Sequence, residues 1–141
     1  MNLKFAAAAA VVAILSATAA QAEIIHFAAT LSGADEVPAK STAGKGTVTA
    51  ELETKERSLA FRATYSDLSG PATMAHFHGP ADAGANAGVQ IAVKDPSSPI
   101  GGAAQLTQEQ VDQLLAGKWY FNVHTAANPG GEIRGQLKRL N

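Results

Sequence analysis

Hydrophobic and polar residues alternate along two neighbouring segments in the first half of the chain. In residues 46–53 (GTVTAELE), every second residue from Val48 onwards is apolar, with threonine and glutamate between. Residues 58–65 repeat the alternation after a polar turn at residues 54–57. A period of two with one polar face is typical of antiparallel strands that have one face in water. The two segments therefore predict a β-hairpin.

Further short segments rich in apolar and β-branched residues follow the same pattern, separated by glycine, proline and other turn-forming residues. These predicted strands are residues 23–32, 74–78, 89–94, 118–125 and 132–140. Seven short strands with regular turn signals indicate an all-β fold. We expect an antiparallel β-sandwich or flattened barrel.

One segment has a helical pattern instead. Thr107 and Gln110 have the spacing of a capping box, and the apolar residues that follow recur at helical intervals. Gly117 lies where a glycine commonly ends a helix. The sequence therefore predicts one short helix among the strands.

The start of the sequence has the features of a secretory signal peptide. Lys4 carries a positive charge, residues 5–15 are apolar and alanine-rich, and a small-x-small sequence ends at Ala22. We expect residues 1–22 to be removed after Ala22, which leaves residues 23–141 as a single domain. The predicted destination is the periplasm or the extracellular medium. A lipoprotein anchor would require a cysteine, so no membrane anchor is expected.

Charge and cysteine content exclude several classes of function. The chain has 11 basic and 12 acidic residues, whereas nucleic-acid binding requires a basic surplus or stripe. It has no cysteine, so a thiol nucleophile is excluded and any metal must be bound without thiolates. The sequence also has no nucleophile elbow of the Gly-x-Ser-x-Gly type and no phosphate-binding loop.

His76 and His78 form the most informative motif. In an extended strand, side chains two residues apart lie on the same face, with Cα atoms about 6.6 Å apart. Gly79 and Pro80 then end the strand, so the two imidazoles are expected at a strand end that is open to solvent. The pair predicts a metal site or a catalytic surface.

The other two histidines extend this hypothesis. His124 lies near the end of another predicted strand and supplies a third imidazole; His26 is a candidate fourth ligand, although an ordinary polar surface residue is the better interpretation for it alone. Three imidazoles without thiolates suit copper(II) or zinc, and copper binds more tightly by the Irving–Williams order. Both metals stay open as alternatives.

Four residues near the histidines in sequence are candidates for supporting roles. Asp82, Asn122 and Glu132 could accept the second ring N–H of a ligand histidine. Arg134 falls on the outward face of the last predicted strand, where it could pair with Glu132 or attract an anion. A solvated strand residue is the favoured interpretation of Arg134.

Several sequence blocks together resemble the chordin-type CHRD domain family. They occur in the family's order and cover nearly the whole predicted mature chain: ATLSGADEVP (29–38), AHFHGP (75–80), YFNVHT (120–125) and NPGGEIRGQL (128–137). The resemblance implies a secreted β-sandwich domain, found as repeats in animal chordin and as single domains in bacterial exported proteins. It implies little about activity.

A looser resemblance is to copper–zinc superoxide dismutase, a Greek-key β-sandwich whose copper is also bound partly by a His-x-His pair on a strand. This resemblance implies a superoxide dismutase-like Greek-key arrangement of the expected β-sandwich. His76 and His78 match that pair, and His124 would serve as a further ligand. The dismutase pattern needs more histidines, a zinc-binding aspartate and a disulfide, whereas this chain has four histidines and no cysteine. The resemblance is therefore compatible with a single copper site.

Two classes of function follow. The first is an exported metal-binding protein that holds copper, or zinc, through His76, His78 and His124, with His26 as a possible fourth ligand and with redox or superoxide-related activity as an extension. The second is a non-enzymatic secreted interaction module that binds a protein partner or another copy of itself through strand edges or the loop at residues 81–88. Whether the protein is an enzyme is left open.

Overall fold

The computed structural model describes residues 21–141. The predicted signal peptide falls almost entirely outside this range, so it stays a prediction. Within the described range, no helix is both long and apolar enough to cross a membrane.

The described chain contains nine strands, one short α-helix and one turn of 3-10 helix. In chain order they are β1 (Ile24–Ser32), the 3-10 turn η1 (Gly33–Asp35), β2 (Lys45–Glu53), β3 (Ser58–Ser66), β4 (Ala72–His78), β5 (Val89–Ala92), β6 (Ile100–Gln105), α1 (Gln108–Leu115), β7 (Tyr120–Thr125), β8 (Ile133–Gln136) and β9 (Lys138–Arg139).

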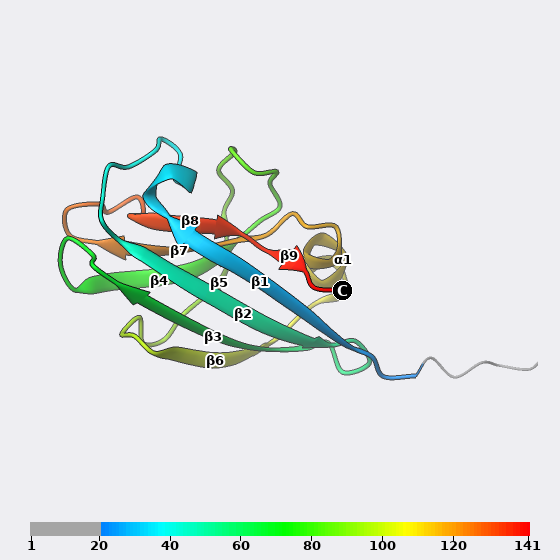
Figure 1. Cartoon of the computed structure of the whole chain (residues 1–141). Helices are drawn as coiled ribbons and strands as arrows, with labels where there is room; N and C mark the ends of the chain where they lie inside the picture. The colour runs from blue at the N-terminus through cyan, green and yellow to red at the C-terminus, as the bar shows by residue number, and fades with distance from the viewer. Residues whose placement is uncertain (1–20) are drawn as a thin grey trace, which may run out of the picture.

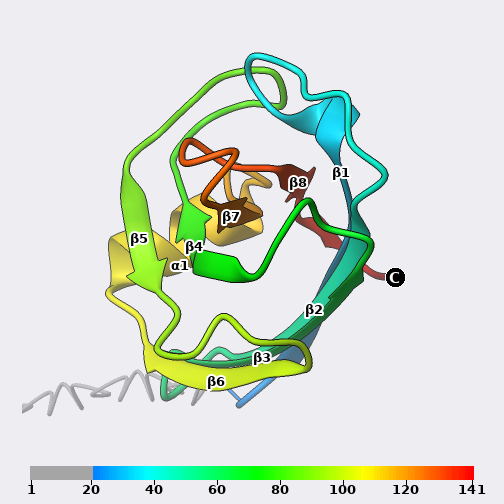
Figure 2. The ribbon, with the colours of Figure 1, turned by 90° about the vertical axis from the view of Figure 1, so that its left-hand side faces the viewer.

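All the strands belong to a single antiparallel sheet (Figure 1). Its order is β5-β4-β7-β8-β1-β2-β3-β6, with β9 paired to β1. Seen from one end, the strands follow one another around a ring, and the two edge strands β5 and β6 come towards each other (Figure 2). The predicted all-β antiparallel fold with one short helix is confirmed, and the sheet nearly closes into a barrel.

The predicted hairpin is present as β2 and β3. The two strands pair from Lys45 with Ser66 to Glu53 with Ser58. The alternating apolar residues of β2 are buried, and its threonines and Glu51 are exposed. Arg57 in the connecting turn has a φ of 54°, a left-handed conformation that tight turns often require. Local alternation and turn chemistry therefore account for this part of the sheet.

Helix α1 also forms as predicted. The Thr107 hydroxyl accepts a hydrogen bond from the Gln110 backbone N–H, and the Gln110 side chain accepts one from the Thr107 backbone N–H. Gly117 has a φ of 71° just past the end of the helix, a conformation that favours glycine. Val111 and Leu114 are buried against the barrel core.

Two strand predictions need correction. Strand β6 was not predicted, because its sequence IGGAAQ is rich in glycine and alanine, which have low strand propensity. It forms because it pairs with β3, and Gly102 leaves room for the ring of Phe61. The single closing strand predicted at residues 132–140 is divided into two strands: β8 pairs with β7 and with the end of β1, and β9 pairs with β1 alone.

The aromatic part of the core lies beneath β4 and β7. The rings of Phe77 and Phe121 are 4.8 Å apart in an edge-to-face arrangement, and Trp119 is fully buried beside Phe77. Because successive residues of a strand point to opposite faces, the inward direction of Ala75 and Phe77 sets the outward direction of His76 and His78. The core therefore determines where the histidines lie.

Candidate metal centre

The pairing of β4, β7 and β8 aligns polar residues in rows across the outer face of the sheet. His76 lies opposite Asn122, which lies opposite Arg134. In the next row, His78 lies opposite Tyr120. Residues directly opposite each other in an antiparallel pair share a face and interact. The polar residues of three strands, separated by up to 58 positions in sequence, are thereby brought together.

This outer face is covered by the loop between β4 and β5, residues 79–88, which arches over it (Figure 2). Arg134 holds the loop in this position by donating hydrogen bonds to the Ala85 carbonyl (2.6 Å) and to Asn86 Oδ1 (3.0 Å). Asn86 in turn donates to the Val37 carbonyl. The turn at residues 129–131 lies over the other end of β7, so every residue of β7 is buried between the core and these covering segments.

Three of the four histidines converge on this face. His76 Nδ1 lies 3.0 Å from His124 Nε2. One ring nitrogen from each of His76, His78 and His124 lies within 4.8 Å of the other two. The three rings thus occupy the spacing from which three nitrogens can bind one metal ion. His78 and His124 are buried, whereas His76 is partly exposed.

Backbone carbonyls determine the tautomers of the two buried histidines. His78 Nδ1 is 3.0 Å from the Ala87 carbonyl and His124 Nδ1 is 2.9 Å from the Pro129 carbonyl. Because a carbonyl oxygen can only accept, each Nδ1 must carry the proton and donate it. In the neutral rings, both Nε2 atoms are then left with a lone pair. Hydrogen bonding of the distal nitrogen to a carbonyl is the usual way in which proteins orient ligand histidines.

The two Nε2 lone pairs point at the same atom. Asn122 Oδ1 lies 3.0 Å from both His78 Nε2 and His124 Nε2. Of the predicted supporting residues, Asn122 is therefore the one in contact with the histidines. Asp82 pairs with Lys118 at the surface instead.

The surroundings of His76 and His78 favour the form of the imidazole that binds metal. Burial, together with the nearby His124 and His78, lowers the pKa of His76 to about 4. Burial is also the largest influence on His78; it lowers the pKa of that ring despite the hydrogen bonds to Ala87 and Asn122, which act in the opposite direction. Neutral imidazole is the ligand form. Near neutral pH, these two rings therefore do not have to lose a proton before they bind a cation.

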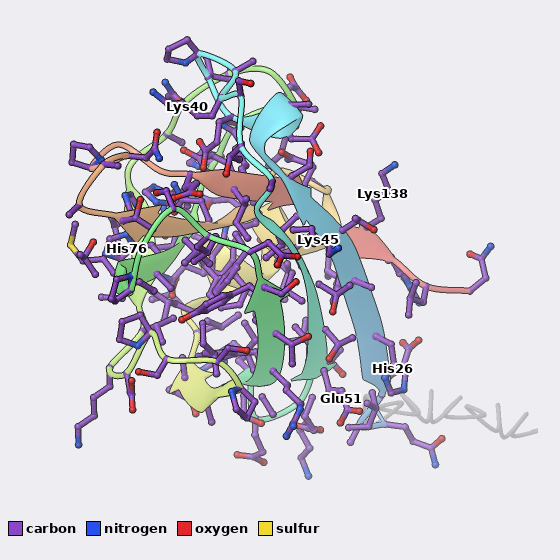
Figure 3. The ribbon with its side chains drawn as sticks, turned by 60° about the vertical axis from the view of Figure 1, so that its left-hand side comes forward. His26, Lys40, Lys45, Glu51, His76 and Lys138 are labelled. Carbon is purple, nitrogen blue, oxygen red and sulfur yellow. The ribbon has the colours of Figure 1, made fainter. Side chains whose placement is uncertain are left out.

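His26 is not part of this cluster. It lies on β1, its side chain is 53% exposed, and its Nδ1 is 3.5 Å from a carboxylate oxygen of Glu51. Figure 3 shows His26 and His76 on different sides of the molecule. The expectation of His26 as a fourth ligand is therefore not supported by this geometry: β1 is separated from β4 by β8 and β7 in the sheet.

The interpretation of Arg134 as a solvated residue is wrong. The residue is 2% exposed, and its guanidinium lies 3.4 Å from the centre of the Tyr120 ring. Alternation correctly placed Arg134 on the outer face, but the loop at residues 79–88 covers that face. Its bonds to the loop make Arg134 a structural tether.

Glu132 serves a second polar cluster beside the histidines. Its buried carboxylate accepts hydrogen bonds from the hydroxyls of Thr42, Ser69 and Thr125, from the Ser69 backbone N–H and from the side chain of Asn128. Burial alone would raise the pKa of Glu132, but these hydrogen bonds outweigh it and bring the pKa to about 2. Glu132 therefore holds loops together and does not orient a histidine.

Glu36 was missed by the sequence analysis. It is buried next to Asn122 and Gly131, and its Oε1 has no hydrogen-bond partner within residues 21–141. Burial raises the pKa of Glu36 to about 7, although Arg134 and Asn122 act to lower it. Glu36 lies within the ATLSGADEVP block, but no local spacing connects it with the histidines.

The donor atoms at the centre of the cluster fit copper(II) or zinc. Three imidazole nitrogens and one amide oxygen form a set without thiolates, and imidazole suits both metals. Calcium and magnesium require mainly oxygen ligands, which this set lacks.

The structure thus defines a small protein whose antiparallel sheet nearly closes into a barrel, with a three-histidine cluster, two of its members buried, on one covered face. Residues 27–137 match the family model of the CHRD domain, so the chain belongs to the CHRD domain family. Domains of this family are typically secreted interaction-type modules. Comparison with curated proteins gave no significant match, and comparison with solved structures likewise gave none.

Proposed function

We propose that this protein is an exported metal-binding member of the CHRD family, which holds copper, or alternatively zinc, through His76, His78 and His124. Copper is the favoured metal because imidazole sites bind it more tightly than zinc. Asn122 lies close enough to the same point to assist through its side-chain oxygen.

The observation that supports this proposal is a shortage of hydrogen-bond donors at the centre of the cluster. His78 and His124 both use their Nδ1 proton on a backbone carbonyl, so their Nε2 atoms and Asn122 Oδ1 are all acceptors. His76 Nδ1 lies 3.0 Å from His124 Nε2 and can donate to that atom, which leaves His78 Nε2 and Asn122 Oδ1 facing each other as two acceptors 3.0 Å apart. Acceptors packed together without donors cost free energy. A bound cation would interact with all of them at once, and the lowered pKa values of His76 and His78 disfavour a proton in that role.

The test is elemental analysis of the protein purified from the export compartment without an affinity tag, followed by titration with copper and zinc. We expect about one metal ion per chain for the wild type. The triple variant His76→Ala/His78→Ala/His124→Ala should stay folded and bind none. His26→Ala is the matched control, because it removes an imidazole outside the cluster and should bind as the wild type does. Stoichiometric metal in the triple variant, or none in the wild type, would contradict the proposal.

One argument for a superoxide-related activity of this site does not hold, because Arg134 is not available to attract an anion. Steering of an anion requires an exposed positive charge near the metal, and Arg134 was the candidate. The structure buries Arg134 beneath the loop and uses its guanidinium to bind Ala85 and Asn86. We therefore limit the proposal to metal binding, and dismutase activity that follows copper loading would extend it.

A second candidate function is binding to a protein partner or to another copy, and edge strand β6 favours it. Gly101, Gly102 and Ala103 are exposed and carry no charge, and charged side chains are the usual protection of a free edge against pairing. If β6 pairs between molecules, light scattering should detect a defined oligomer that Ala103→Lys disrupts. A wild type that stays monomeric at all concentrations would exclude self-association through β6.

A further inference from the structure

Met74 lies beside the histidine cluster on the same face of the sheet. It precedes His76 by two residues on β4, so its side chain points outward as that of His76 does. On the neighbouring strand, its direct partner is His124. Side chains of directly opposed residues have Cβ atoms about 5 Å apart. Met74 therefore adjoins two of the three candidate ligands.

Met74 lies outside the hydrophobic core, as do four other large apolar residues of the described chain. It is 44% exposed, whereas Ala75 and Phe77, on the inner face of the same strand, are fully buried. A methionine has three flexible side-chain torsions, so its sulfur can reach past the Cβ position towards either neighbouring imidazole. Packing in the core does not account for a methionine here.

The thioether sulfur also changes which metal the site prefers. Thioethers are soft ligands that select copper(I), whereas zinc and copper(II) are well served by imidazole. The chain has two methionines and no cysteine, and Met1 lies outside the described residues. Within residues 21–141, Met74 is thus the single sulfur atom available to a metal.

We propose that Met74 supplies a thioether ligand to copper bound at the histidine cluster, next to His76 and His124, and thereby enables the site to hold copper(I). This inference rests on the proposed function, since it requires a metal at the cluster. In this arrangement the Met74 thioether lies at the partly exposed edge of the site, and the imidazole of His78 lies at the buried end.

The test compares wild type with Met74→Leu, which removes the sulfur and keeps an apolar side chain of similar size at an exposed position. The matched control is Met74→Leu/Leu115→Met, which restores a partly exposed methionine on helix α1 instead of β4. Copper(I) affinity is measured without oxygen by competition with bicinchoninate. The copper environment is measured by X-ray absorption on the copper(I)-loaded proteins.

We expect sulfur scattering in the wild type and none in Met74→Leu, together with a loss of copper(I) affinity of about tenfold or more. Zinc affinity should be unchanged in Met74→Leu, and Leu115→Met should not restore the copper(I) affinity. A wild type that binds copper through nitrogen and oxygen alone, with an affinity that Met74→Leu does not alter, would overturn the role of Met74 and leave the proposed function standing. If the wild type binds neither copper nor zinc, both proposals are refuted.

Discussion

Strands β2 and β7 have the same antiparallel pairing but opposite surroundings. In β2, apolar residues point into the barrel and most of the alternate residues are exposed. In β7 all six residues are buried, because the loop at residues 79–88, Glu36 and the turn at residues 129–131 cover its outer face. A polar side chain on an uncovered face is solvated by water, whereas one on a covered face needs partners within the protein. Those partners hold the side chains in one geometry, which is why the candidate site lies on the covered face.

Removal of a glutamate should therefore cost more free energy of unfolding on the covered face than on the exposed face. Glu132→Ala leaves the donors of Thr42, Ser69 and Thr125 without their shared acceptor in a buried position. We expect a loss of about 3 kcal/mol in the free energy of unfolding, measured by urea denaturation. Glu51→Ala, on the exposed face of β2, should change the free energy of unfolding by less than about 0.5 kcal/mol. Equal losses would contradict the distinction between the two faces.

Acidification should weaken the covered region through the same carboxylate. The pKa of Glu132 is about 2 in the folded protein against an ordinary value of 4.5. Between these values the unfolded chain binds more protons, so the stabilisation by Glu132 is complete above pH 4.5 and is lost as the pH falls towards 2. Urea denaturation in this pH range should show a shallower loss of stability for Glu132→Gln than for the wild type. Equal slopes for the wild type and Glu132→Gln would contradict this role of Glu132.

Metal should stabilise the covered region specifically. A ligand that binds only the folded state, at 100 times its dissociation constant, adds about 2.7 kcal/mol to the free energy of unfolding. We expect copper to raise the thermal midpoint of the wild type and of His26→Ala, and to leave that of the triple histidine variant unchanged. A shift of equal size in all three proteins would indicate binding outside the cluster.

Loss of the Arg134 side chain should make the loop at residues 79–88 more mobile, with a smaller effect on the stability of the whole fold. Arg134→Leu removes the hydrogen bonds to Ala85 and Asn86, and we expect a cost of about 1–2 kcal/mol. Amide hydrogen exchange should quicken mainly in residues 79–88, because local opening follows the loss of local contacts. Arg62→Leu, on the exposed face of β3, is the matched control and should leave exchange in this loop unchanged.

Local signals in the sequence predicted the elements that depend on neighbouring residues. The β2–β3 hairpin follows from alternation with a polar turn, and α1 follows from the capping box of Thr107 and the terminal Gly117. Strand β6 was missed because its glycines and alanines have no strand propensity of their own. Pairing with β3 and the fit of Gly102 against Phe61 made it a strand.

The candidate site was predictable only in part. The spacing of His76 and His78 placed both imidazoles on one face, since period-two alternation is a local property of a strand. The same alternation includes Met74, which the sequence analysis did not use. The approach of His124 depends on the pairing of β4 with β7, and His26 stays apart because β1 lies two strands beyond β7. Strand order cannot be read from periodicity.

The sequence by itself determined the strand alternation, the helix and the family, because these depend on residue types at short spacings. The tertiary structure decided which strands became neighbours and which outer face was covered. Arg134 shows the difference most clearly: alternation directed it outward, and a loop from another part of the chain buried it. Burial depends on what packs over a residue, and the tautomers that point His78 and His124 at a common centre depend on carbonyls brought in by that packing.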